Sequence, residues 1–133
     1  GDLDLYVANL AQANTLYLNR GDGSFEDGSA ASGLGSDLNA STSAMAADFN
    51  GDTTLDLLVG NTGEQPNLLY LNDGKGHFRL ATEGSGLKIA SNSVALATAD
   101  FNKDGILDLY VVNANLPDQL FLNSSPQNEG CWR

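Results

Sequence analysis

Residues 48–61 read DFNGDTTLDLLVGN and residues 100–113 read DFNKDGILDLYVVN, so one pattern recurs after 52 residues. Residues 1–9, GDLDLYVAN, match the second half of the same pattern. A fixed period of this length is typical of repeat architectures, in which each repeat packs on its neighbours. The chain of 133 residues therefore contains about two and a half copies of one unit.

The rest of each unit is repeated as well. A Leu-aromatic-Leu-Asn segment stands at 16–19, 69–72 and 120–123, and two copies continue through a glycine turn to Phe25 or Phe78. We therefore divide the chain into four parts. They are a partial first repeat at 1–40, which lacks its opening strand and most of its aspartate-rich loop, a complete second repeat at 41–92, a partial third repeat at 93–123, and a tail at 124–133.

Each unit predicts four short strands. The first is small and apolar, at 43–47 and 93–99, and the second alternates, with Leu55, Leu57 and Val59 on one face. The third is apolar on both faces, as in a strand packed between two layers, and the fourth follows a hairpin turn that contains glycine. An Ala-rich helix at residues 40–47 is the competing interpretation, but it is shorter than the ~12 residues that a marginal helix needs.

Repetition of such units predicts an all-β fold built of β-propeller-type blades, each a four-stranded antiparallel sheet. Blades converge on a central axis, where a strand of small residues fits and bulky side chains would collide. Thirteen of the 17 acidic residues are Asp, and the chain has 15 Gly. This composition favours turns over helices.

Charge and composition exclude several classes of protein. The formal net charge is −11, whereas a nucleic-acid-binding surface must be positive, so no nucleic-acid partner is expected. No apolar run approaches the ~18 residues of a membrane helix, so we expect no membrane insertion. The single His77 and the single Cys131 provide no zinc site and no nucleophile–base arrangement, so we expect no enzyme. Cys131 either pairs with a partner outside the chain or lies buried.

The strongest chemical signal is the pattern D-x-N-x-D-x-x-x-D, which occurs twice. Oxygen ligands at alternate positions of a tight turn converge on one point, and the backbone carbonyl of position 7 can add another. Carboxylates so close repel one another unless a cation lies between them, and oxygen ligands in a flexible loop favour Ca2+ over Zn2+ and Mg2+. The predicted ligands are Asp48, Asn50, Asp52, Thr54 and Asp56 in the first loop, and Asp100, Asn102, Asp104, Ile106 and Asp108 in the second.

Two other interpretations of these loops are an EF-hand and a plain turn. An EF-hand shares the first five positions but needs Glu at position 12, where Val59 and Val111 stand. The Asp and Asn residues could also be turn formers alone, but their recurrence with the same spacing argues against this. Position 6 favours glycine and is Gly105 in the second loop but Thr53 in the first, so we expect the first loop to be more strained.

Three further motifs stand outside the two loops. Asp2 and Asp4 belong to an incomplete third metal site, which lacks the ligands at positions 1, 3 and 5. Asn39 and Asn123 begin N-x-S sequons and are candidate glycosylation sites in a secretory pathway. Residues 20–22 spell Arg-Gly-Asp, but the turn itself demands the glycine, so we assign this tripeptide no function.

These motifs resemble the FG-GAP and VCBS repeats of integrin α-chain propellers and of many secreted bacterial proteins. The resemblance covers nearly the whole chain and rests on AxADFNxDGxxDLxVxN at 97–113 and NDGxGxF at 72–78. Residues 122–133 are similar to the start of the ASPIC/UnbV segment that follows such repeats in relatives of cartilage acidic protein. The resemblance implies a seven-bladed β-propeller, Ca2+ in its hairpin loops, an extracellular location, and a role in adhesion or scaffolding.

We therefore expect an extracellular calcium-binding repeat protein, secreted or at the cell surface, with a structural, adhesive or scaffold role. A full propeller needs more residues than this chain has, so we expect either a stretch of a longer protein or assembly with other copies through open sheet edges. The expected partners are other protein chains, further repeats of the same protein, or glycans. The alternative function is a carbohydrate-binding module or the accessory propeller of a secreted polysaccharide-active enzyme.

Overall fold

The computed structural model describes residues 2–83, 85–88, 90–124 and 132. Within these residues the fold is all-β, as the sequence predicts, and it contains one single-turn helix that the sequence did not predict. The strands are β1 (Leu5–Val7), β2 (Thr15–Asn19), β3 (Phe25–Asp27), β4 (Ser41–Ala47), β5 (Asp56–Asn61), β6 (Gln65–Pro66), β7 (Leu68–Asn72), β8 (Phe78–Leu80), β9 (Ala90–Ser91), β10 (Ser93–Ala99), β11 (Asp108–Asn113) and β12 (Gln119–Phe121), and the helix is α1 (Ser29–Ser32).

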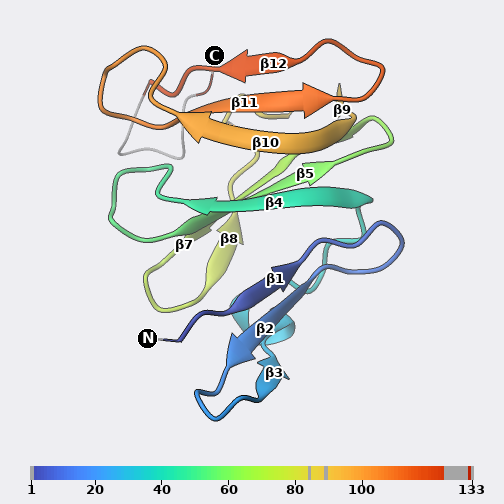
Figure 1. Ribbon diagram of the computed structural model, residues 1–133, viewed down its shortest axis with the longest axis vertical. Helices are drawn as coiled ribbons and strands as arrows, with labels where there is room; N and C mark the ends of the chain where they lie inside the picture. Colours follow the sequence, from blue (N-terminus) through green and yellow to red (C-terminus); the bar gives the residue numbers. More distant parts are fainter. Residues whose placement is uncertain (1, 84, 89, 125–131, 133) are drawn as a thin grey trace.

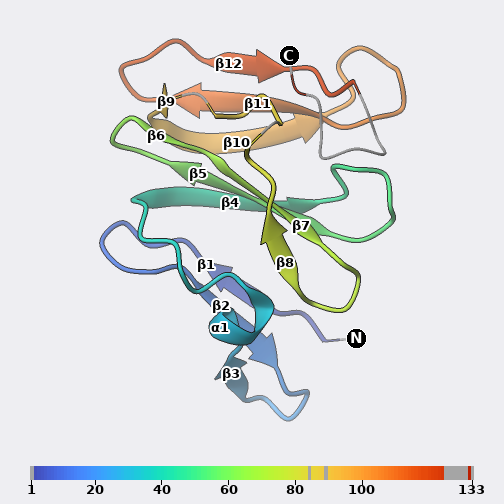
Figure 2. The same cartoon turned by 180° about the vertical axis from the view of Figure 1, so that it is seen from behind.

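The strands form three antiparallel sheets, each corresponding to one copy of the repeat. Unit 1 is the sheet β1-β2-β3, unit 2 is β4-β5-β7-β8, and unit 3 is β10-β11-β12, while β6 pairs with β9 in a separate ribbon. The sheets follow one another along the long axis, with units 1 and 3 at opposite ends, and they do not close into a ring (Figure 1). The helix α1 lies beside β2 of unit 1 (Figure 2).

The predicted strands are present in the structure, except that Leu55 does not belong to the second strand. Residues 41–47 form β4, so the alternative of a helix at 40–47 is wrong. The second strand, predicted to be buried on one face, is buried at all six positions of β5. Unit 2 has a neighbour on each side, and this is why both faces of its strand are covered. Leu55 precedes β5 and is exposed, so it is not part of the predicted apolar face.

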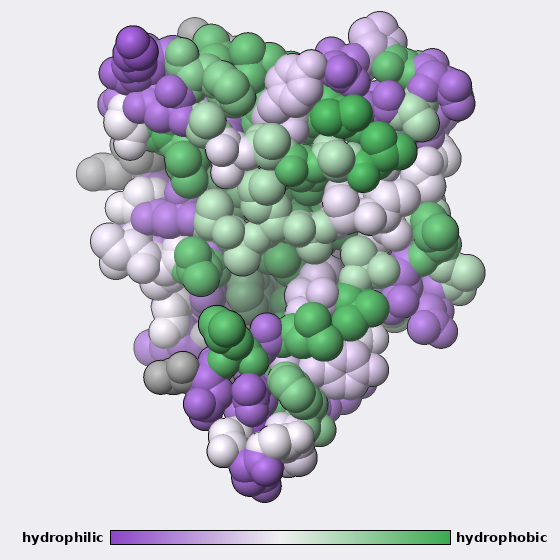
Figure 3. Space-filling view, in the orientation of Figure 1, coloured by the Kyte–Doolittle hydropathy of each residue, from purple (hydrophilic) through white to green (hydrophobic). Residues whose placement is uncertain are grey.

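The first strands of units 2 and 3, β4 and β10, each form one edge of their sheet and lie side by side. Ala44, Ala46, Ala95 and Ala97 are exposed there, and Figure 3 shows weakly hydrophobic side chains across the middle of this face. Small side chains let the two strands approach each other, as the sequence predicts for strands near a common axis.

The faces of neighbouring units form two apolar cores. We call the side of a unit that receives the next unit its forward face, and the side that packs on the preceding unit its rear face. In the first core, the rear face of unit 2 packs against unit 1; its members are Leu34, Leu57, Val59, Leu68 and Tyr70, with Tyr6, Leu16 and Phe78 at the margin. In the second, the forward face of unit 2 packs against the rear face of unit 3; its members are Ala47, Phe49, Leu58, Leu69, Leu71, Ala81, Leu87, Leu109, Val111, Phe121 and Trp132, with Leu96 and Leu107 at the margin.

Trp132 contributes an apolar side chain that the sequence analysis placed in the tail. It pairs with Asn123, as Phe25 and Phe78 pair with the asparagine that ends the third strand of their own units. Trp132 is therefore equivalent to these two phenylalanines. Its ring lies 5.7 Å from that of Phe49, edge to face, and joins unit 3 to unit 2.

A buried polar contact accompanies each core. The side-chain amide of Asn14 in unit 1 donates to the hydroxyl of Ser41 in unit 2 at 2.8 Å. At the next junction the hydroxyl of Ser93 donates to the side-chain oxygen of Asn67, also at 2.8 Å. All four side chains are buried, and in the first junction removal of the Ser41 hydroxyl would leave the buried amide of Asn14 without this acceptor. The two junctions are therefore built alike in their polar as well as their apolar contacts.

Gly33, where the backbone after α1 meets unit 2, provides a test of the first junction. Its φ is +85°, and a Cβ atom there would lie 2.6 Å from the carbonyl oxygen of Phe78. Gly23 has a similar φ of +89° but no atom within 4 Å of the same position. We expect Gly33→Ala to lower the free energy of unfolding by about 2–4 kcal/mol and Gly23→Ala by only about 1–2 kcal/mol. Both substitutions strain the backbone, but only Gly33→Ala also creates a clash that displaces unit 2. Denaturant unfolding measures both, and equal losses would contradict the close junction.

Candidate metal-binding loops

Each predicted metal loop connects the first strand of a unit to the second. Asp48 follows β4 directly and Asp56 is the first residue of β5; Asp100 and Asp108 hold the same places beside β10 and β11. The pairing of these strands fixes both ends of each loop. The structure therefore brings positions 1 and 9 of each predicted site to the same end of one hairpin.

The carboxylate at position 1 accepts hydrogen bonds from the loop backbone. In the first loop, Asp48 accepts from the backbone N–H of Gly51 at 2.7 Å and of Thr53 at 2.8 Å. In the second, Asp100 accepts from the backbone N–H of Gly105 at 2.9 Å. These bonds pull the loop into a tight turn around the carboxylate.

Positions 3 and 5 are paired with each other. The side-chain amide of Asn50 donates to Asp52 at 2.9 Å, and that of Asn102 donates to Asp104 at 2.8 Å. The hydroxyl of Thr54 is the main cause that holds the pKa of Asp52 below its ordinary value. This exposed carboxyl is therefore charged at neutral pH and faces water.

The aspartate at position 9 has a structural role that the sequence analysis missed. Asp56 is buried and accepts the backbone N–H of Phe49 at 3.0 Å with one oxygen and that of Asn72 at 2.9 Å with the other. Asp108 makes the equivalent bonds, at 2.8 Å each, to Phe101 and Asn123. The carboxylate thus joins the loop to the end of the third strand. Burial raises the pKa of Asp56 above its ordinary value, and the negative charges at positions 1 and 5 raise it further.

In unit 1, Asp4 has the same role as the aspartate at position 9. It accepts the backbone N–H of Asn19, at the end of the third strand, at 2.9 Å. The repeated Asn is the sequence signal for this contact between the aspartate and the end of the third strand. Asn19 and Asn72 strengthen it, since each also donates its side-chain amide to a backbone carbonyl of its own loop at 3.1 Å. Asp2 is exposed beside Gly21, and whether it binds metal remains a prediction.

Backbone strain is present in both loops, not mainly in the first. Positions 4 and 6 have positive φ in each loop: Gly51 at 77° and Thr53 at 72° in the first, Lys103 at 64° and Gly105 at 88° in the second. Each loop therefore has one glycine and one residue for which this conformation is unfavourable. Thr53 is β-branched, so this conformation is less favourable for it than for Lys103. The first loop is therefore still the more strained of the two, but the difference in strain is smaller than the residues at position 6 alone predict.

The donor chemistry of both loops fits a hard cation. Positions 1, 3, 5 and 9 offer carboxylate or amide oxygens, and each carboxylate oxygen that accepts one N–H keeps a further lone pair. In the part of the chain that the structure describes, however, no three His, Cys, Asp or Glu side chains gather at metal-binding spacing. The carbonyl ligands expected at Thr54 and Ile106 likewise remain a prediction.

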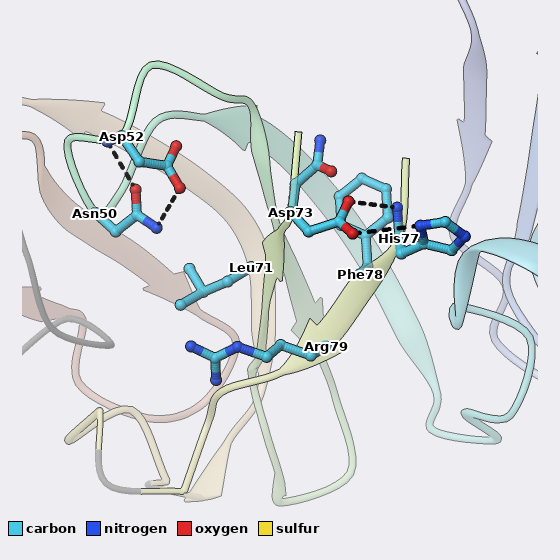
Figure 4. Close-up of a pocket in the computed structure, with 8 residues that line it drawn as sticks. Asn50, Asp52, Leu71, Asp73, His77, Phe78 and Arg79 are labelled. Carbon is cyan, nitrogen blue, oxygen red and sulfur yellow. Dashed lines mark hydrogen bonds and ion pairs between the residues drawn. The ribbon is translucent and has the colours of Figure 1, made fainter. Parts of the chain in front are cut away.

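An open cleft lies beside the first loop. It has a volume of about 390 Å³, and its lining includes Asp52, Leu71 and Arg79. Figure 4 shows the Asn50–Asp52 pair on one side of the cleft, and the contact between the Asp73 carboxylate and the His77 ring, 3.3 Å apart, on the other. The hairpin turn of β7 and β8 thus lies next to the first candidate metal loop.

The two candidate glycosylation sites differ in accessibility. The side chain of Asn123 is fully buried, and its amide nitrogen, the atom to which a glycan would be attached, donates to the carbonyl oxygen of Phe49 at 2.9 Å. The amide of Asn123 is therefore inaccessible in the folded chain, and glycosylation there stays a prediction. Asn39 is half-buried in the segment before β4 and remains a candidate. Cys131 lies outside the described residues.

No helix of the described residues has the length and the apolar character needed to cross a membrane.

The chain is similar in sequence to a known repeat family. A model of the FG-GAP-like repeat matches residues 1–59 and 48–111. Cartilage acidic protein 1 of Homo sapiens is 33% identical over 113 residues, and that of Xenopus tropicalis 31% over 113 residues; the alignment covers 83% of this chain but only 17% of either relative. The chain belongs to the FG-GAP-like repeat family.

Proposed function

We propose that the chain is a calcium-binding part of an extracellular repeat protein with a structural, adhesive or scaffold role. Its membership of the FG-GAP-like repeat family and its similarity to cartilage acidic protein 1 support this role. The chain spans 17% of the length of these relatives, so the proposal concerns the properties of this segment within a larger assembly.

The observation that carries calcium binding is the identity of the two loops. They share the same ligand types, the same amide-to-carboxylate pair and the same buried aspartate, at equivalent places in two units. When bound, Ca2+ would neutralise the carboxylates at positions 1, 5 and 9. Because the folded chain would bind the ion and the unfolded chain would not, binding would stabilise the fold.

Calcium titration of the chain after EDTA treatment tests the proposal. We expect two ions to bind, and the melting temperature to rise with calcium, because each site adds about 2.7 kcal/mol when free calcium is 100 times its Kd. Asp52→Ala and Asp104→Ala should each remove one bound ion. Glu64→Gln, which changes a charge outside both loops, should leave two. A melt that is unchanged by millimolar calcium would overturn the proposal.

The alternative of carbohydrate binding has less support, because, of the aromatic residues in the three third strands, only Tyr17 of unit 1 is exposed. The aromatic residues of the third strand in units 2 and 3, Tyr70 and Phe121, are buried in the cores between units rather than exposed for stacking on a sugar. Burial also raises the pKa of Tyr70, as expected for a phenol inside a core.

A further inference from the structure

Asn123, which follows the third strand of unit 3, contacts both candidate metal loops. Its backbone N–H donates to the carboxylate of Asp108, at position 9 of the second loop, at 2.8 Å. Its side-chain amide donates to the carbonyl oxygen of Phe49, at position 2 of the first loop, at 2.9 Å. Figure 1 shows the two loops, β4 to β5 and β10 to β11, on the same side of the molecule, one above the other. One buried residue therefore joins two loops that belong to different units.

Phe49 is in turn held by the carboxylate of its own loop. Its backbone N–H donates to Asp56, at position 9 of the first loop, at 3.0 Å. Its ring packs edge to face on Trp132 of unit 3. A continuous path of buried hydrogen bonds thus connects the position 9 carboxylates of the two loops through Phe49 and Asn123.

The equivalent asparagines of the other units are bonded within their own unit. Asn19 and Asn72 each donate their side-chain amide to a backbone carbonyl of their own loop, and these bonds are exposed. The amide of Asn123 instead crosses the junction between units 2 and 3 and reaches a residue 74 positions earlier in the chain. A buried hydrogen bond is costly to leave unmade. The backbone of the first loop at Phe49 and the end of unit 3 at Asn123 must therefore be ordered together.

We propose that the two loops are coupled through Asn123, so that calcium in one loop raises the affinity of the other. This inference rests on the proposed function, because it concerns the regulation of the same two sites. Asp108, once fixed by a bound ion, holds Asn123 in place, and Asn123 then holds the first loop at Phe49. The second ion meets a loop that is already ordered, so its binding costs less conformational entropy. Linkage requires the same effect in the opposite direction.

Electrostatics oppose this coupling. An ion in one loop cancels part of the negative charge that attracts an ion to the other. Salt at ~0.15 M screens charges that are more than about 8 Å apart, and it therefore weakens this opposing effect. The coupling through the hydrogen bonds is buried and keeps its strength, so the titrations belong at this ionic strength.

Calcium titration of the chain at ~0.15 M salt measures the coupling. Asp52→Ala and Asp104→Ala each keep one intact loop and give its affinity alone. Wild type should bind its second ion at least about fivefold more tightly than these two affinities predict. Asn123→Ala, alone and combined with either single-loop substitution, should give two independent sites. Asn19→Ala makes the same change at the equivalent residue of unit 1 and should keep the cooperativity of wild type.

Hydrogen exchange in EDTA tests the link without metal. Gly105→Ala strains the second loop alone, because Gly105 has a φ of +88° and no atom lies within 4 Å of the added Cβ. Gly23→Ala imposes the same kind of strain in the hairpin turn of unit 1, where φ is +89°. We expect Gly105→Ala to speed exchange of the Phe49 N–H at least about fivefold more than Gly23→Ala does. This difference should vanish in the Asn123→Ala background.

The outcomes separate this inference from the proposed function. Two ions bound independently by wild type would overturn the coupling and leave the calcium sites standing, as would cooperativity that Asn123→Ala keeps. A chain that binds no calcium would overturn the proposed function and the effect on affinity together, and the exchange experiment would still report whether the loops are linked. Equal acceleration by the two glycine substitutions would show that they are not. Circular dichroism confirms that each variant is folded. If Asn123→Ala does not fold, the wild-type titration and the two glycine variants decide.

Discussion

Replacing Asp108 by Ala should lower the free energy of unfolding by about 2–4 kcal/mol in EDTA, where the loop holds no calcium. The carboxylate accepts the backbone N–H groups of Phe101 and Asn123, at 2.8 Å each. Its loss leaves two donors without a partner. The buried N–H of Asn123 costs about 1–3 kcal/mol when left unsatisfied, and the part-buried N–H of Phe101 costs less. Asn123 lies at the end of the third strand, so the damage extends from the loop into the second core.

Asp104→Ala is the matched control in the same loop. Asp104 is exposed, and it accepts from Ile106 and Asn102 rather than from a buried backbone group. In EDTA this variant should unfold within about 1 kcal/mol of wild type, as is usual for surface substitutions. In calcium it should lose the stabilisation that the ion gives to this loop. If both variants were equally stable in EDTA, the carboxylate at position 9 would not stabilise the fold through its hydrogen bonds to the loop and the third strand.

The largest single effect is expected from Phe49→Ala. Phe49 is 1% exposed and packs edge to face on Trp132 in the core between units 2 and 3. Truncation of a buried Phe to Ala typically costs about 3–5 kcal/mol, because apolar contacts are lost and a cavity remains. Denaturant unfolding should therefore show a midpoint well below that of wild type.

Phe101→Ala makes the same chemical change at the equivalent place in unit 3. Phe101 is 50% exposed, so we expect a loss of less than about 1 kcal/mol. The two variants share residue type, loop position and neighbouring sequence, and they differ only in whether another unit covers the ring. Equal losses would show that the junction between units 2 and 3 contributes little to stability.

The sequence predicted the strands because their signals are local and repeated. The small residues of β4, the apolar third strands and the glycine turn before Phe78 each fix a strand or its boundary within a few residues. The candidate metal loops could be proposed from the sequence for the same reason, since their expected ligands lie within nine residues of one another, and metal binding stays a prediction. The helix alternative at 40–47 failed because a strand partner, β5, supplies the hydrogen bonds that an isolated short segment lacks.

Other properties could not be read from a single unit. The sequence places Asp56 among metal ligands, but only the third strand folding back shows that this carboxylate also holds the N–H of Asn72. Asn123 is a sequon residue in the sequence and a buried donor in the structure, because unit 2 covers it. Strain was expected at position 6 alone, whereas the hairpin geometry requires positive φ at position 4 as well, as at Lys103.

Spacing along the chain, by itself, determined the all-β repeat and the identity of its two candidate calcium loops, since turn, strand and ligand patterns act over a few residues. Tertiary structure alone decided which of the equivalent side chains are buried. Phe49 and Phe101 occupy the same place in the repeat, yet one lies in a core and the other faces solvent. The reason is physical: burial depends on the neighbouring unit that covers a face, and a residue's own sequence neighbours carry no information about that unit.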